Sequence, residues 1–168
     1  DEGLVGSEMC IRDSYNTVTS ELFDGKKGIK VIPCYYKKDY PEWSDRGDGP
    51  GAPVAVHLPN SPVIATGKRD GSKIRLPNGN YLEETASYYV MIETKTGGYT
   101  PALITMKSTQ LNVSKKWNSM MKTIQIPDGK GGFAIPPMHG VVYNLASTLQ
   151  KNDKGSWYGW VVTQDRIM

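Results

Sequence analysis

The sequence is poor in the residues that build catalytic and metal sites. Its 168 residues include two cysteines, Cys10 and Cys34, and two histidines, His57 and His139. Neither histidine stands at metal-ligand spacing from a cysteine or from the other histidine. No phosphate-binding loop and no nucleophile elbow occur along the chain. We therefore expect no catalytic residue, no metal, no cofactor and no enzymatic activity.

Long apolar runs are also missing, and none approaches the length needed to span a membrane. The chain is long enough to bury one hydrophobic core, so we expect a single domain without membrane contact. Because cysteine is so scarce, no disulfide framework is expected, and a reducing cytoplasm is the expected location.

The first residues do not resemble part of a folded protein. The run LVGSEMCIRDS (Leu4–Ser14) has neither strand alternation nor a helical stripe, and it lacks the basic start and apolar stretch of a signal peptide. It is similar to the in-frame translation of a transposase adapter used in DNA-sequencing libraries; a disordered natural terminus is the alternative. We therefore expect residues 1–14 to be a non-native tail with few contacts, and residues 15–168 to form the domain.

Setting this tail aside raises the net positive charge. Residues 1–14 hold one basic and four acidic side chains, Arg12 and Asp1, Glu2, Glu8 and Asp13. Their removal takes the chain from 20 basic and 17 acidic residues to 19 and 13, and the net charge from +3 to +6. This excess is compatible with a polyanionic partner.

Most of the remaining sequence predicts β-strands, because β-branched and aromatic residues alternate between clusters of turn residues. The expected strands and hairpins cover residues 29–40, 52–58, 72–84, 87–106 and 141–164. Asn78-Gly79 predicts a type I′ turn in the small third element, and Gly97-Gly98 turns the longer hairpin that follows. The last hairpin turns around residues 151–155.

One segment, residues 108–122, predicts a helix. Its apolar side chains fall at helical spacing on one side, and Ser108 or Thr109 can cap its start. That side carries Val113, Trp117, Met120, Met121 and Ile124. Five main strands with a helix between the third and the fourth is the order of an OB-fold barrel, although other α+β sheets share it. We expect a mainly β fold with one helix, an OB-like five-stranded barrel with inserted hairpins.

Aromatic and basic residues stand together at several places in the sequence. These candidate nucleic-acid-binding residues are Tyr35, Tyr36, Lys37, Lys38, Trp43, Lys95, Lys115, Lys116, Trp157, Tyr158 and Trp160. Single-stranded nucleic acid needs this pairing, because cations neutralise phosphates while flat rings stack on unpaired bases. The alternative role for an aromatic residue is packing, which the helical spacing favours for Trp117.

Strand alternation limits how many of these residues can face one ligand. Tyr35 and Lys37 share one side of their strand, while Tyr36 and Lys38 share the other. Trp157 likewise faces away from Tyr158 and Trp160, so at least one of these three rings is expected to fill the barrel.

Three segments carry a family resemblance: IKVIPCYYKKDYPEW, LITMKSTQLNVSKKWNSMM and NDKGSWYGWVV. They are similar to a family of small tailed-phage proteins of the replication and recombination region, over residues 15–162. These proteins resemble phage single-stranded DNA-binding proteins. The resemblance implies single-stranded DNA as the partner, phage replication or recombination proteins as further partners, and the host cytoplasm as the location.

The leading hypothesis is therefore a phage protein that binds single-stranded DNA without sequence preference, alone or as a homo-oligomer. A structural or adaptor phage protein that binds no nucleic acid is the alternative. A third class, a metal-dependent nuclease, would require Glu83, Glu84 or Glu93 to converge with an aspartate in a cleft. We favour the interpretation that these three carboxylates are solvent-exposed groups at strand ends.

Overall fold

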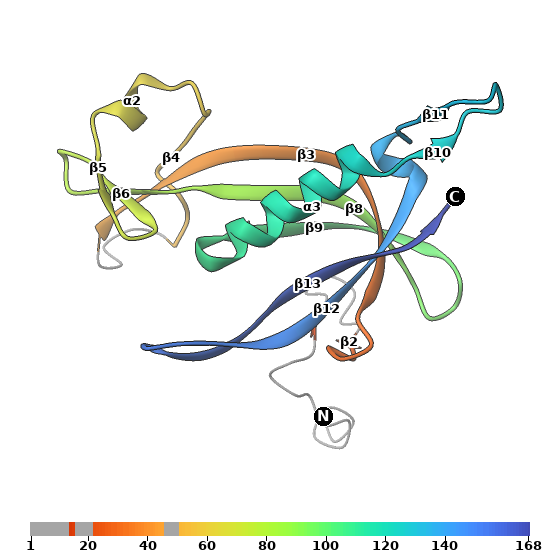
Figure 1. Ribbon diagram of the computed structural model, residues 1–168. Helices are drawn as coiled ribbons and strands as arrows, with labels where there is room; N and C mark the ends of the chain where they lie inside the picture. Colours follow the sequence, from red (N-terminus) through yellow and green to blue (C-terminus); the bar gives the residue numbers. More distant parts are fainter. Residues whose placement is uncertain (1–13, 16–21, 46–50) are drawn as a thin grey trace, which may run out of the picture. The chain divides into compact units, whose positions relative to one another are not determined.

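The computed structural model describes residues 14–15, 22–45 and 51–168 (Figure 1). The expected adapter-derived tail, residues 1–14, lies outside this described part except for Ser14. That residue belongs to the short strand β1 (Ser14–Tyr15), which pairs with β2 (Leu22–Phe23). The fold is mainly β with one long helix, as the sequence predicts.

The chain divides into two compact units, each built from segments that are distant in the sequence. Unit 1 comprises residues 1–34, 90–102 and 119–168, and unit 2 comprises residues 35–89 and 103–118. Four elements run through both units: β3 (Ile29–Trp43), β8 (Thr85–Glu93), β9 (Tyr99–Lys107) and α3 (Leu111–Thr123).

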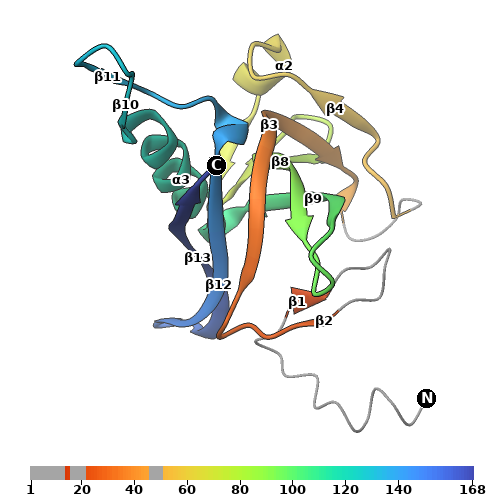
Figure 2. The same cartoon turned by 90° about the vertical axis from the view of Figure 1, so that its right-hand side faces the viewer.

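Unit 1 is dominated by a long C-terminal hairpin, which confirms the hairpin expected there. Its strands are β12 (Val141–Asn152) and β13 (Gly155–Ile167), paired antiparallel along their full length. β12 also pairs with β3, where Tyr143 lies opposite Val31. Figure 2 shows β3 running between β12 and β8. The remaining elements are β10 (Ile126–Pro127), β11 (Phe133–Ala134) and a 3₁₀ turn at Met138–Gly140.

The core of unit 1 follows from strand alternation. Val31 on β3, Val90 on β8 and Leu145 on β12 are at most 2 % exposed, and the residues two positions away on these strands are also buried. A period of two places such residues on one face of each strand, so apolar side chains meet where the strands pair.

Unit 2 carries the inserted hairpins. Its short elements are β4 (Ala55–His57), α2 (Pro62–Ala65), β5 (Lys68–Asp70), β6 (Lys73–Arg75) and β7 (Tyr81–Glu83). The far part of β3 pairs with β4 and β7, and β7 continues through β6 to β5. Ile74, Leu76 and Leu82 form a buried cluster here, which explains the apolar positions of the expected small hairpin.

The turn of that small hairpin differs from the type I′ prediction. Gly79 adopts a left-handed φ of +88°, but Asn78 does not have a positive φ. Instead, the Leu76 N–H donates to the Asn80 carbonyl, which closes a five-residue connection with a single left-handed position. The Asn78 side chain accepts from the Asn80 N–H within the turn and donates to the carboxylate of Glu42.

The expected helix is present as α3, preceded by a 3₁₀ turn at Ser108–Gln110. Ser108 has a φ of +54° within this turn, and the N-cap position of the turn is Lys107, which makes no side-chain cap hydrogen bond. Within α3, Trp117 of the expected apolar side is fully buried, while Val113, Met120 and Met121 are half-buried. Ile124, which is 9 % exposed, lies just beyond the end of the helix.

The five long strands follow in the expected order along the sequence, with the helix between the third and the fourth, but the OB-fold is not established. β3 pairs with β8 and β12, β8 pairs with β9, and β12 pairs with β13. A closed barrel would need β9 to pair with β13, and the described strands show no such pairing. In the described part of the chain, no helix has the length and apolar character needed to cross a membrane.

Candidate functional site

Two exposed tyrosine rings lie side by side on the open face of unit 2. Tyr35 on β3 and Tyr89 on β8 are 59 % and 41 % exposed, and their ring centroids are 5.9 Å apart. On β9, Leu103 is 53 % exposed while Ile104 beside it is buried. We call the surface formed by Tyr35, Lys37, Tyr89 and Leu103 the tyrosine face.

The tyrosine face is exposed because the opposite side of the sheet is already covered. Tyr88, next to Tyr89, is fully buried and stacks on Trp117 of α3 at 4.2 Å between ring centroids. Its hydroxyl contacts the Ser114 hydroxyl at 2.7 Å and donates to Asn118 at 2.9 Å. Burial raises the pKa of Tyr88 to about 12. The helix therefore takes one face of β8, and strand alternation leaves the other face to solvent.

Of the adjacent tyrosines in YYKK, the structure assigns Tyr35 to the open face and Tyr36 to the helix side. The half-buried Tyr36 ring lies 5.0 Å from the ring of Tyr88. One ring facing out and one facing in is what alternation predicts. Lys37 points toward the open face, with its ammonium 5.9 Å from the centre of the Tyr89 ring.

The lysines on the unit 2 parts of β3 and β9 all have carboxylate partners. Lys37 lies 3.4 Å from Asp39, and Lys107 lies 2.8 Å from Glu83. A hydrogen bond to Asp39, reinforced by the charge of that carboxylate, raises the pKa of Lys37. Lys38 is paired in the same way with Glu84, and their hydrogen bond raises its pKa. The positive charge of Lys37 and Lys38, two of the five candidate lysines, is therefore locally balanced.

The helix lysines do not join the tyrosine face. Lys115 and Lys116 are exposed on α3, the helix that covers the Tyr88 side of the sheet. Trp43 is half-buried at the end of β3, where it pairs with Tyr81 of β7. The structure therefore brings Tyr35 and Lys37 together but separates them from the two helix lysines.

The other four candidate residues belong to unit 1. Lys95, in the β8–β9 turn, donates to the Leu22 carbonyl at 3.0 Å. Trp157, Tyr158 and Trp160 are half-buried on β13, and none of them fills a core as expected for at least one. The strand register places Trp157 opposite Gln150, to whose side chain its indole N–H donates at 3.0 Å.

The carboxylates considered for a nuclease do not form a metal site. Glu83 and Glu84 are paired with lysines, and Glu93 contacts Arg166 at 3.3 Å. In the part of the chain that the structure describes, no three His, Cys, Asp or Glu side chains lie close enough together to hold a metal ion.

Sequence reasoning missed Tyr89 and Leu103 as members of the candidate site. The sequence did contain a signal for both residues. Each strand of the 87–106 hairpin has apolar residues on both faces, and a single helix can cover only one of these two faces. It also missed the carboxylate partners of the lysines. Asp39 is close in sequence to Lys37, but Glu83 and Glu84 are distant in sequence from Lys107 and Lys38.

The family described as Pam3 phage gp34-like protein matches residues 13–168. No curated protein and no solved structure matches the chain.

Proposed function

Because the chain belongs to the Pam3 phage gp34-like family, we propose that it is a non-enzymatic structural or adaptor protein of a bacteriophage. It would act by binding protein surfaces, one of them through the tyrosine face. The observation that supports this proposal is the combination of two exposed tyrosine rings with lysines that are already neutralised by carboxylates. Tyrosine-rich surfaces with few unpaired charges are typical of protein interfaces.

Electrostatics distinguishes this proposal from nucleic-acid binding. A protein that tracks phosphates gains affinity by releasing counterions, which requires cations that are available to the phosphates. Lys37 would have to give up Asp39 to serve a phosphate beside Tyr35. A protein partner needs no such exchange, because the ion pair can stay at the rim of the interface while the rings become buried.

Size-exclusion chromatography with light scattering, with and without oligo-dT, tests the proposal. We expect oligomers whose mass does not depend on oligo-dT. The double variant Tyr35→Glu/Tyr89→Glu should lower that mass, whereas Tyr99→Glu, at a tyrosine that is 45 % exposed in unit 1, should not. A monomeric protein that binds oligo-dT would contradict the proposal.

Single-stranded DNA binding is the second candidate, with phage replication or recombination proteins as further partners. The observation that favours it is the Lys37 ammonium over the Tyr89 ring, beside the exposed ring of Tyr35. Lys115 and Lys116 on α3 would add charge at a separate surface. This function predicts fluorescent oligo-dT binding that weakens steeply from low to high salt and is lost when both exposed tyrosines become alanine.

A further inference from the structure

Unit 1 contains a pocket of about 370 Å³ beside the turn that follows β2. Phe23 and Ile29 line it and are 7 % and 5 % exposed, so they form its floor. The half-buried Glu93 and Thr94 form a wall, and the exposed Lys27 and Lys95 lie at the rim. Asp24 is also exposed and lines the pocket, so the base is apolar and the rim carries two lysines and one aspartate.

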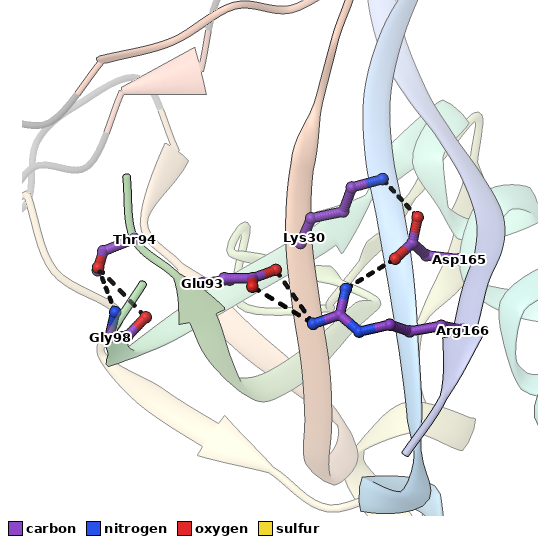
Figure 3. A network of polar contacts seen from close by, with 6 residues as sticks. All are labelled: Lys30, Glu93, Thr94, Gly98, Asp165 and Arg166. Atoms are coloured by element: carbon purple, nitrogen blue, oxygen red, sulfur yellow. Dashed lines mark hydrogen bonds and ion pairs between the residues drawn. The ribbon is translucent and has the colours of Figure 1, made fainter. Parts of the chain in front are cut away.

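Ion pairs fix the wall of this pocket. Arg166 of β13 bridges Glu93 of β8 at 3.3 Å and Asp165 at 2.9 Å (Figure 3). Lys30 of β3 binds the same aspartate at 2.6 Å. The Thr94 hydroxyl accepts from the Gly98 N–H at 3.1 Å, which shapes the β8–β9 turn at the edge of the pocket. The pocket is therefore formed in the free chain.

The same unit presents a projecting apolar element, the hairpin of β10 and β11. Phe133 is 70 % exposed, and Ile135 just beyond the hairpin is 58 % exposed. The turn is held in shape by Asp128, whose Oδ1 accepts the N–H groups of Lys130 and Gly132 at 2.8 and 2.9 Å. These bonds lower the pKa of Asp128. A large apolar side chain on a shaped turn loses little freedom on binding.

This hairpin and the pocket lie at opposite ends of unit 1. β10 and β11 are at the top of both views and β2 is at the bottom (Figures 1 and 2). A hairpin cannot fill the pocket of its own chain across this length. Two different surfaces that complement each other at opposite ends of a subunit produce a head-to-tail contact, which builds rings or filaments.

We propose that the pocket receives the β10–β11 hairpin of a second copy of this chain. Phe133 would cover Phe23 and Ile29, and Asp128 would lie beside Lys27 at the rim. The match is apolar against apolar, and the Asp128 carboxylate would meet the Lys27 ammonium. The inference deepens the proposed structural function and rests on it, but it uses a surface separate from the tyrosine face.

Two variants disable the two halves of this contact. Phe133→Asp removes the apolar tip, and Leu58→Asp, at a leucine that is 65 % exposed in unit 2, is its matched control. Lys27→Glu reverses the charge at the rim, and Lys26→Glu is its control, since both lysines are exposed but only Lys27 lines the pocket. All four variants are made in the Tyr35→Glu/Tyr89→Glu background, so that the tyrosine face does not contribute to assembly.

Light scattering over a concentration series gives the result. We expect the background protein and both controls to exceed the 18.6 kDa mass of one chain as concentration rises. The Phe133→Asp and Lys27→Glu proteins should each stay near that mass. Mixed together, they should recover particles of two chains and no larger, because one intact hairpin and one intact pocket remain to pair.

Three outcomes would overturn the inference: a background protein that is monomeric throughout, a loss of assembly in the controls, or no recovery on mixing. Circular dichroism and thermal melting check that each variant is folded. If the tyrosine variants lower the mass of the parent protein while Phe133→Asp does not, this inference fails and the proposed function stands. Salt-dependent binding of oligo-dT by a monomer would instead overturn the proposed function.

Discussion

Tyr88 and Trp117 stack with ring centroids 4.2 Å apart and ring planes 29° apart. This contact joins β8 to α3 within unit 2 and determines which face of the sheet stays open. Because the two rings are fully buried, Tyr89 has only the opposite face available. The packing of one aromatic pair thus creates the exposed surface on which the proposed function depends.

Removing the Trp117 ring should destabilise unit 2 strongly. Trp117→Ala deletes the largest fully buried side chain and leaves a cavity beneath Tyr88. Such substitutions cost about 3–5 kcal/mol in the free energy of unfolding. Tyr88→Phe keeps the ring and loses only the hydroxyl contacts with Ser114 and Asn118, so it should cost about 1 kcal/mol. Urea unfolding measures both, and equal losses would contradict the packing described.

Gly28 should tolerate no side chain. Its φ is +81°, and a Cβ atom there would lie 2.6 Å from the Leu145 carbonyl oxygen. Gly97 is the matched control, because its φ is +84° but a Cβ atom would meet nothing within 4 Å. Backbone strain of about 1–3 kcal/mol applies to both alanine variants. Gly28→Ala should therefore lower the melting temperature clearly more than Gly97→Ala, and equal shifts would rule out the close approach to β12.

The long elements could be predicted from the sequence because their signals are local. Alternation marked the strand from Ile29 and both long hairpins, and helical spacing placed Trp117 in a core. The candidate site was less accessible, since it depends on which strand face the helix covers. The pairing of Lys107 with Glu83, for example, is created only when distant strands meet. The left-handed Ser108 and the single-glycine turn at Gly79 likewise depend on surroundings that no local pattern encodes.

Acid should weaken unit 2 through Glu42. His57 contacts this buried carboxylate at 2.8 Å and Asn80 donates to it at 3.0 Å, and these hydrogen bonds lower the pKa of Glu42. Because the folded-state pKa lies below the ordinary value of 4.5, the stability that Glu42 contributes is fully present above that pH. It is lost as the pH falls through the folded-state pKa.

Melting temperatures measured from pH 7 down to pH 3 check this dependence. Glu42→Gln should flatten the acid limb of the curve. Asn80→Ala removes one donor, so the folded-state pKa of Glu42 should move back toward its ordinary value and the acid limb should become shallower than in the parent protein. An acid limb that is unchanged in both variants would show that Glu42 is not the responsible group.

The rate of tyrosine nitration should show directly which tyrosines lie on the open face. Tetranitromethane attacks accessible phenolates, so Tyr35 and Tyr89, at 59 % and 41 % exposure, should react early. Tyr88 and Tyr143 are at most 1 % exposed, and burial raises the pKa of both hydroxyls, so they should react last. Peptide mapping by mass spectrometry gives the order. If the tyrosine face binds protein, the first two tyrosines should become protected at concentrations where the chain assembles, while the exposed Tyr99 of unit 1 keeps reacting.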